Sequence, residues 1–525
     1  MRHCRASRGG DEPLVKTPQG WIRGIREEGY DTYLGIPYGV VDPKNIFGAP
    51  KPSPKLKGVF EADDDSRVCP QIEEYNHTAI GTLDCLNLNV YVPRSSHKKA
   101  VLVWIYGGGF TLGFARRHMY GPGYLVPHDV ILVTFNYRLG PYGFFCLDTK
   151  EVPGNQGMKD QVMAFRWIRD NIAAFGGDKE RITAFGCSAG AVSIELHLSS
   201  NQERLFNQAI IESGSPDMKG ALASANRSYP FILAKHFGYN TTDLTEALDN
   251  LAKLDPLTVV KASSDIFDEY PICMEKQFEG VENFITHLEF NKTKVQAMNI
   301  IIGYNSQELI MEYAKRQAKD YVKLQNIFNE TLEYFKLENL HEVARLMRNF
   351  YIGYEDVSIK VRNELINFNS DAQIINYVWR DMNKLISKGS NIYNYIFAYT
   401  GKRNFVKSRN NVTFGGASHA DEIGYLFDMS VLNARLDKND SLIVDRMTTM
   451  WTNFAKYGKP IPRVSKLLPK QWLPVTRDKL NYLEIDEVMK NGYNPHHKTI
   501  AFWDMFYVNK NSSVQAALIL SNNNN

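Results

Sequence analysis

The sequence predicts an α/β fold in which helices cover a doubly wound, mostly parallel sheet. Apolar runs rich in β-branched residues at 99–106 and 130–135 are typical of strands that are buried on both faces. Between 157 and 175, apolar residues instead recur about every 3.6 positions, which is typical of an amphipathic helix. Strand and helix patterns therefore alternate along the chain, as a doubly wound sheet requires.

The remaining elements continue this alternation. Gly176 and Gly177 end the predicted helix, and a short strand at 181–185 and a helix at 192–198 follow. Two more apolar strands are expected at 299–303 and 393–398. The segments 239–268 and 320–384 carry helical periodicity without strand patterns, so we expect them to form helices over the ligand-binding edge of the sheet.

The chain has 525 residues, of which 44% are hydrophobic and 23% are charged, a composition typical of globular proteins. Length alone would favour about three domains, but single α/β enzymes with insertions often exceed the usual domain size. Neither a linker nor an internal repeat is evident. We therefore expect one domain over residues 12–510, with disordered ends at 1–11 and 511–525.

Charge and hydropathy exclude several classes of partner. The net charge is only +3, and no Lys/Arg-rich run, zinc-finger spacing or RNA-binding motif accompanies it, so we expect no nucleic-acid partner. The longest apolar stretches, such as 100–106 and 300–302, are far shorter than the roughly 18 residues of a membrane span. We expect neither a cofactor nor a metal, and the oligomeric state stays open.

The cellular compartment has two interpretations. Residues 1–10 are basic and small, without an apolar stretch behind them, so the sequence as given favours the cytosol. If the first exon is wrongly assigned, the protein would instead be secreted. Asn-x-Ser/Thr triplets, which accept glycans only in the secretory pathway, support that alternative. They include Asn76, Asn240, Asn291, Asn329 and Asn411.

Six cysteines are too few to form a disulfide scaffold in a chain of this length. Cys146 and Cys187 lie in apolar or motif segments, where a buried thiol is the simple interpretation. Cys69 and Cys85 lie 16 residues apart around a polar loop. They would be bridged in an oxidising compartment and would stay reduced in the cytosol.

The run GCSAG at 186–190 has the G-x-S-x-G pattern and lies between a predicted strand and a predicted helix. Such a turn projects a serine hydroxyl from the end of a strand, and its glycines let neighbouring backbones approach closely. Five-residue matches also arise by chance, but the strand-to-helix setting favours function. We predict an α/β-hydrolase fold with Ser188 as its nucleophile.

A second glycine run, YGGGF at 106–110, ends another predicted strand. A flexible turn would explain a glycine triplet alone. A triplet that ends one strand while a nucleophile turn ends another instead has the arrangement of this fold's oxyanion hole. We expect the amides of Gly108, Gly109 and Ala189 to be the donors.

These motifs resemble those of the type-B carboxylesterase and cholinesterase family, especially its insect esterases. The resemblance rests on segments 103–110, 154–161, 175–178 and 186–190, and it extends through 35–38, 84–90, 451–455 and 501–504. It implies a serine hydrolase that acts on small-molecule esters. It also implies that Glu308 is the triad acid and His419 the general base, in the chain order Ser, Glu, His of this fold. Among 12 histidines and 58 acidic residues, spacing alone could not select them.

Four positions depart from the family pattern. Cys187 replaces a common Glu beside the nucleophile, and the 69–85 loop lacks the tryptophan that binds choline in cholinesterases, so cationic substrates are disfavoured. Ile46 and Leu83 replace an Arg and a Glu that pair with each other, a double loss that costs little. Leu309 replaces a glycine and could narrow the pocket near Glu308.

Two other readings compete with catalysis. This fold includes adhesion proteins resembling neuroligins, which have lost the nucleophile, and a slow esterase could mainly sequester hydrophobic esters. The chain retains serine, acid, base and oxyanion glycines together. We therefore favour a serine carboxylesterase that acts on uncharged esters, whose physiological substrate the sequence does not identify.

Overall fold

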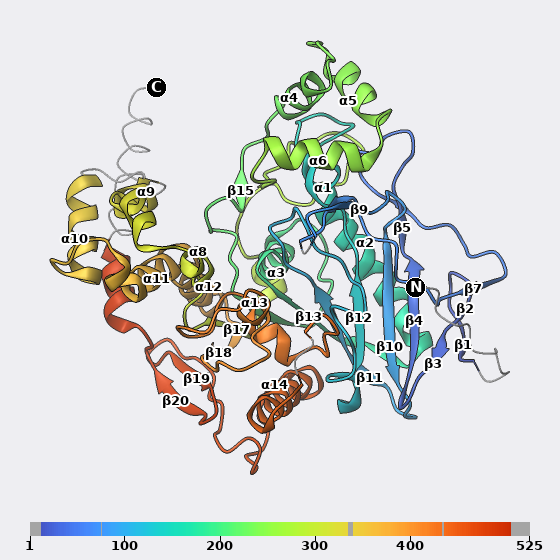
Figure 1. Cartoon of the computed structure of the whole chain (residues 1–525). Helices are drawn as coiled ribbons and strands as arrows, with labels where there is room; N and C mark the ends of the chain where they lie inside the picture. The colour runs from blue at the N-terminus through green and yellow to red at the C-terminus, as the bar shows by residue number, and fades with distance from the viewer. Residues whose placement is uncertain (1–11, 75, 334–339, 433–434, 506–525) are drawn as a thin grey trace.

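The computed structural model describes residues 12–505 apart from 75, 334–339 and 433–434. The expected disordered ends at 1–11 and 511–525 lie outside these residues. Within them, the main sheet has 11 strands in the order β20-β19-β18-β17-β14-β13-β11-β12-β10-β4-β3. From β12 to β19 each neighbouring pair is parallel, and the strands at both edges are antiparallel (Figure 1). The predicted doubly wound, mostly parallel sheet of an α/β-hydrolase is confirmed.

The main sheet consists of β3 (Ile25–Arg26), β4 (Tyr30–Pro37), β10 (Asn87–Pro93), β11 (Lys99–Ile105), β12 (Ile131–Phe135), β13 (Gly177–Cys187), β14 (Gln208–Glu212), β17 (Asn299–Asn305), β18 (Asn391–Phe397), β19 (Asn481–Ile485) and β20 (Lys490–Tyr493). Smaller sheets are formed by β1 (Leu14–Lys16), β2 (Trp21–Arg23), β5 (Gly39–Val40), β6 (Lys51–Pro52), β7 (Val59–Glu61), β8 (Gln71–Ile72), β9 (Ala79–Ile80), β15 (Leu222–Ala223) and β16 (Ile272–Cys273).

The α-helices are α1 (Gly140–Phe144), α2 (Gln156–Asn171), α3 (Ala189–Ser199), α4 (Tyr229–His236), α5 (Leu244–Ala252), α6 (Pro256–Ile266), α7 (Lys292–Val295), α8 (Met311–Ala314), α9 (Ile327–Glu333), α10 (Leu340–Ile352), α11 (Arg362–Ser370), α12 (Asn376–Ser387), α13 (Phe405–Arg409) and α14 (Lys438–Tyr457). Short 3₁₀ turns are η1 (Val126–His128), η2 (Ile172–Phe175), η3 (Ala318–Leu324), η4 (Ile359–Val361) and η6 (Asp421–Tyr425), and η5 (Asp371–Ile375) is a π-helical turn.

The central strands form because their side chains are apolar on both faces. All seven residues of β11 are buried, and its register places Val103 beside Val133 of β12 and Ala184 of β13. Helices α2, α3 and α14 pack on these strands. Helix α14 has clear end signals, since the Asp437 side chain accepts two backbone N–H groups at its start and Gly458 takes a positive φ of 68° at its end.

The two segments predicted to be helical differ in their position. Residues 239–268 form α5 and α6, which Figure 1 shows above the strands together with α4. Residues 320–384 lie within η3 to α12, and α12 packs on β17 and β18. Both segments form helices, but neither contributes a described residue to the cavity beside Ser188. The expectation that they lie directly over this cavity is therefore not met.

Two disulfides join distant parts of the described chain. Cys69 pairs with Cys85, as predicted for an oxidised protein, and closes the polar loop between them. Cys146 pairs with Cys273 across 127 residues, so the interpretation of Cys146 as a buried thiol was wrong. The fold brings the segment after α1 against β16, a proximity that local sequence does not reveal. Cys187 stays a free, buried thiol.

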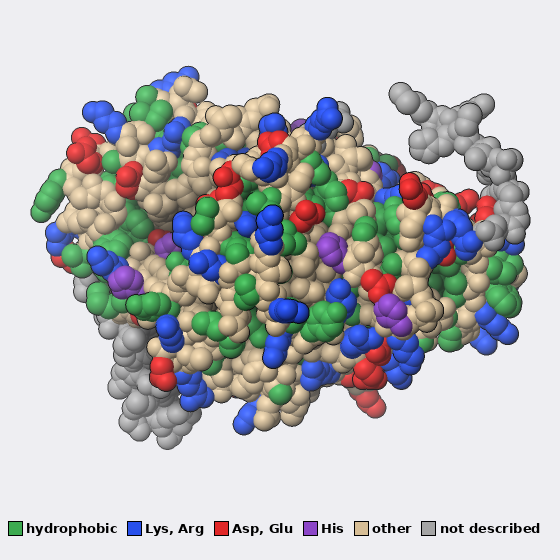
Figure 2. Space-filling model, turned by 90° about the horizontal axis from the view of Figure 1, so that it is seen from below, with side chains coloured by type: hydrophobic (Ala, Val, Ile, Leu, Met, Phe, Trp, Pro, Cys, Tyr) green, Lys and Arg blue, Asp and Glu red, His purple; other side chains and the backbone are tan. Residues whose placement is uncertain are grey.

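Within the described part of the chain, no helix combines the length and apolarity that crossing a bilayer requires. Figure 2 shows Lys and Arg side chains interspersed with Asp and Glu over the face seen from below. Ile46 is buried and Leu83 is partly buried, and both pack against the same core. Both positions therefore carry apolar side chains packed in the core.

The disulfide pattern gives a direct chemical prediction. Peptide mapping of the native protein without reduction should recover one cross-linked pair containing Cys69 and Cys85 and another containing Cys146 and Cys273. Cys187 should react with a thiol reagent only after unfolding, because its side chain is 1% exposed. Rapid labelling of Cys146 or Cys273 in the folded protein would contradict this pairing.

Candidate active site

The candidate site lies where the parallel strands end. Strand β11 leads into the glycines at 107–109, β13 into Ser188, β14 into Ser213 and β17 into the turn that carries Glu308. Parallel strands place all their carboxyl ends at one edge of the sheet, where α/β proteins bind their ligands. Segments far apart in the sequence therefore meet at one edge.

Ser188 occupies a tight turn between β13 and α3. Its φ and ψ are 57° and −125°, a conformation that non-glycine residues rarely adopt and that costs roughly 1–3 kcal/mol. The two motif glycines make room for this turn. A Cβ at Gly186 would lie 2.6 Å from the carbonyl oxygen of Ile105, and one at Gly190 would lie 2.0 Å from it. The pattern noted in the sequence is therefore a steric requirement.

Glu308 and His419 form a tight acid–base couple. His419 Nδ1 lies 2.7 Å from Glu308 Oε2. The other oxygen, Glu308 Oε1, accepts the Ser213 hydroxyl at 2.6 Å and the backbone N–H of Asn305 at 2.7 Å. The Glu308 side chain is fully buried, so these donors hold its carboxylate in a single orientation.

The pKa of His419 lies above its ordinary value. Burial opposes protonation of the imidazole, but the hydrogen bond to Glu308 and the charges of Glu308, Glu422 and Asp421 together outweigh this effect. The side chain is still 27% exposed, on the side that faces the cavity lining. A general base with this pKa is neutral, and therefore active, only above the pH at which it titrates.

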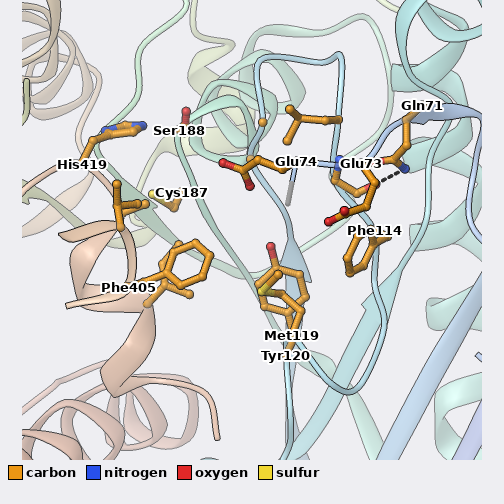
Figure 3. A pocket seen from close by; sticks show the side chains of 17 residues that line it. Gln71, Glu73, Glu74, Phe114, Met119, Tyr120, Cys187, Ser188, Phe405 and His419 are labelled. Atoms are coloured by element: carbon orange, nitrogen blue, oxygen red, sulfur yellow. Dashed lines mark hydrogen bonds between the residues drawn. The ribbon is translucent and has the colours of Figure 1, made fainter. Parts of the chain in front are cut away.

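Ser188 and His419 line one cavity. Figure 3 shows them on the same side of it with Cys187, across from Gln71, Glu73 and Phe114. No hydrogen bond between described atoms links the Ser188 hydroxyl to His419. Such bonds are often long in unliganded enzymes and tighten when substrate binds. The cavity thus brings Ser188, at the end of β13, to the same lining as His419, whose partner Glu308 follows β17.

The three expected oxyanion donors belong to the glycine run after β11 and to the start of α3, next to Ser188. Gly108 has a positive φ of 112° and lies in the cavity lining, and Ala189 is the first residue of α3. None of the amides of Gly108, Gly109 and Ala189 donates to a described acceptor. The N–H of Ala189 is at the helix N-terminus, where the helix itself provides no acceptor. All three amides are therefore without a hydrogen-bond acceptor among the described residues.

The cavity has a volume of about 180 Å³ and a mainly apolar lining. Its lining residues are Gln71, Glu73, Glu74, Gly107, Gly108, Leu112, Gly113, Phe114, Met119, Tyr120, Cys187, Ser188, Phe405, Val406, His419, Ala420 and Ile423. Leu309 is absent from the described lining, because its half-buried side chain lies elsewhere and its N–H donates to Ser370. The predicted narrowing of the pocket by Leu309 is therefore not observed.

Two acidic residues of the lining were missed in the sequence. Glu73 and Glu74 lie in the loop closed by Cys69 and Cys85, and Glu74 forms an ion pair with Arg409 at the end of α13. Arg409 compensates part of this charge. Cys187 contributes none, because burial and then the carboxylates of Glu422, Glu212 and Glu308 raise the pKa of its thiol. No local pattern marked these acids as cavity residues.

Ser213 and Asn305, which hold Glu308, were also missed. Asn305 lies within the motif that identified Glu308, so its position offered a signal. Ser213 follows β14 and is next to the triad only through sheet order. Among the described residues, one side-chain atom each of Cys187, Glu212 and Glu422 lies within 4.8 Å of the other two.

The fold and the convergence of these groups define an α/β-hydrolase with a hydrolase-type nucleophile turn. Comparisons with known proteins agree. The model of the carboxylesterase family matches residues 11–503. Juvenile hormone esterase of Tribolium castaneum is 33% identical over 509 residues, covering 86% of this chain and 84% of that protein. Esterase FE4 of Myzus persicae is 29% identical, covering 90% and 88%.

A solved structure is also similar. Juvenile hormone esterase from Manduca sexta, with OTFP covalently attached, has a TM-score of 0.81 and 25% identity and covers 95% of this chain and 100% of its own. The present chain belongs to the carboxylesterase family and is a carboxylic ester hydrolase.

The steric role of the nucleophile turn is testable. Gly190→Ala should destabilise the protein by at least about 3 kcal/mol, because the new methyl group would meet a backbone carbonyl that cannot move aside. Gly58→Ala is the control for a glycine replacement without a clash, since no atom lies within 4 Å of its Cβ position and its positive φ of 70° is the main source of strain. It should cost about 1 kcal/mol. Equal costs in urea unfolding would refute the argument.

Proposed function

We propose that the chain hydrolyses uncharged carboxylic esters through an acyl-enzyme formed on Ser188. The observation that carries this proposal is the 2.7 Å contact between His419 Nδ1 and Glu308 Oε2, on the wall of the cavity that holds Ser188. This contact leaves the second nitrogen of His419 for the serine. A carboxylate that fixes one imidazole nitrogen makes the other an acceptor for a hydroxyl proton.

The reaction has two halves. In the first, His419 takes the hydroxyl proton as Ser188 attacks the ester carbonyl, and it returns that proton to the departing alcohol. The oxyanion is held by the amides of Gly108, Gly109 and Ala189. In the second half, His419 activates water, which attacks the acyl-enzyme and releases the acid. Glu308 stabilises the imidazolium that forms in both halves.

The lining supports an apolar, uncharged substrate. Aromatic and aliphatic side chains dominate it, including Phe114, Tyr120, Phe405 and Ile423. Cys187 is neutral, and the charge of Glu74 is partly balanced by Arg409. We infer that an apolar acyl or alcohol group gains more here than a cation does. Juvenile-hormone-like, long-chain and pyrethroid-like esters are suitable neutral candidates, the first because two relatives are juvenile hormone esterases.

We also infer that the protein acts in an oxidising compartment. Two disulfides join its described residues, and such bonds are rare in cytosolic proteins. This inference favours the secreted alternative over the cytosolic expectation. Mass spectrometry of protein from native tissue would detect glycans on Asn76 or Asn240, both of which are exposed.

The catalytic proposal predicts large, selective losses. Ser188→Ala and His419→Ala should each lower kcat for p-nitrophenyl butyrate on the order of 10⁴-fold to 10⁶-fold. Glu308→Gln should lower it on the order of 10³-fold to 10⁴-fold, because the amide cannot stabilise the imidazolium. Ser441→Ala, at a partly exposed serine in the first turn of α14, is the matched control and should leave kcat unchanged.

Retention of more than a tenth of kcat by any triad variant would show that the role is misassigned. Substrate charge is tested separately by comparing butyrylthiocholine with its uncharged dimethylbutyl analogue. The neutral ester should have the higher kcat/KM. A preference for the cationic ester would show that Glu73 and Glu74 dominate recognition.

A further inference from the structure

Two buried acids, Glu212 and Glu422, lie close to the candidate triad. Glu212 is the last residue of β14, and Glu422 is in η6, three residues after His419. Both side chains are fully buried. One carboxyl oxygen of each acid and the Cys187 sulfur lie within 4.8 Å of one another. Neither acid takes part in the reaction proposed above.

In each acid, one carboxyl oxygen accepts a hydrogen bond and the other has no described nitrogen or oxygen partner. Trp451 Nε1 donates to Glu212 Oε1 at 2.7 Å, and Asn305 Nδ2 donates to Glu422 Oε2. Glu212 Oε2 and Glu422 Oε1 have no nitrogen or oxygen partner among the described residues. The Tyr395 hydroxyl is likewise buried without a described partner, and its environment includes both acids. Three buried oxygen atoms, of Glu212, Glu422 and Tyr395, therefore have no hydrogen-bond partner among the described residues.

Two carboxylates cannot both be charged in this environment. The titratable groups that face Glu422 are Cys187 from β13, Glu212 from β14, Tyr395 from β18, and the Glu308–His419 couple with the adjacent Asp421. None of these described groups is a lysine or an arginine. Two unpaired charges at this separation and low dielectric would cost several kcal/mol each. A bound proton removes one of them.

Glu422 is connected to the candidate triad in two ways. Its Oε2 accepts from the Asn305 side chain, and the Asn305 backbone N–H donates to Glu308 Oε1. Its charge also acts on His419 directly. The charges that raise the pKa of His419 are those of Glu308, Glu422 and Asp421.

We propose that Glu212 and Glu422 form a proton-holding pair, in which Glu212 keeps a proton and Glu422 is a positioning residue that sets the pH at which His419 becomes a base. The proposal rests on the proposed function of His419. The proton stays on Glu212 because Glu422, beside His419, is stabilised as the anion whenever the imidazole is charged.

The direction of titration agrees with this geometry. Burial, then the charge of Glu308, raises the pKa of Glu422, whereas the charge of a protonated His419 lowers it. Burial and Glu422 raise the pKa of Glu212 well above its ordinary value. When His419 is protonated, an ionised Glu422 favours that state, so the pair raises the pKa of His419. The low-pH limb of kcat/KM should therefore lie higher with Glu422 than without it.

The test compares two matched amide variants. In Glu422→Gln, the charge beside His419 is lost, so the midpoint of the low-pH limb should fall by about half a pH unit or more. In Glu212→Gln, a neutral acid becomes a neutral amide, so the midpoint should stay within about 0.2 unit of wild type. A purely structural role for Glu422 would lower kcat/KM equally at every pH and leave the midpoint in place.

A second measurement does not depend on activity. Infrared spectroscopy of the wild type at pH 8 should show the C=O band of a buried protonated carboxyl, and Glu212→Gln should lack that band. An unmoved midpoint in Glu422→Gln, or equal shifts in both variants, would overturn the proposal. So would the absence of the band, or a stoichiometric metal ion that Glu422→Gln removes.

These outcomes separate the inference from the proposed function. If wild type hydrolyses esters and Ser188→Ala does not, the catalytic assignment stands whatever the two glutamates do. If wild type is inactive, the catalytic assignment fails, while the infrared band still reports on the proton held by Glu212.

Discussion

The carbonyl oxygen of Ile105 lies so close to the turn after β13 that side chains at Gly186 and Gly190 would collide with it. This close backbone approach, available only to glycine, lets the chain reverse directly from strand to helix. Ser188 consequently takes a strained conformation and faces the cavity instead of the core. The neighbouring glycines 107–109 and the N-terminus of α3 occupy their places around it because β11 and β13 are paired in register.

The buried acids near this turn are compensated in different ways. The carboxylate of Glu308 is buried, but its two oxygens have hydrogen-bond partners in His419, the Ser213 hydroxyl and the backbone N–H of Asn305. Glu212 and Glu422 are equally buried but share no such cation, so a proton is the simplest compensation. Cys187 between them adds a neutral thiol where a carboxylate would place a third negative charge. A glutamate at this position would therefore be costly in this chain.

The sequence predicted what depends on local pattern. Periodicity located the central strands and helices, and the glycine motifs are the basis for proposing Ser188 as nucleophile and the amides of Gly108, Gly109 and Ala189 as oxyanion donors. Glu308 and His419 were assigned only through the family resemblance, because the sequence around them does not distinguish them from the many other acids and histidines of the chain. The partners that depend on three-dimensional proximity were missed: Cys273, Glu212 and Ser213 meet their neighbours through sheet order. Glu73 and Glu74 were missed because loop closure, not local pattern, brings them to the cavity.

The central claim is that Ser188 is the residue that bonds to the acyl group. A fluorophosphonate probe, which traps an activated serine covalently, followed by peptide mass spectrometry, tests this most directly. We expect one equivalent of label per chain, on the peptide that contains Ser188, and no labelling of His419→Ala. Ester hydrolysis by a preparation that takes no label at Ser188, or takes it on another residue, would contradict the account.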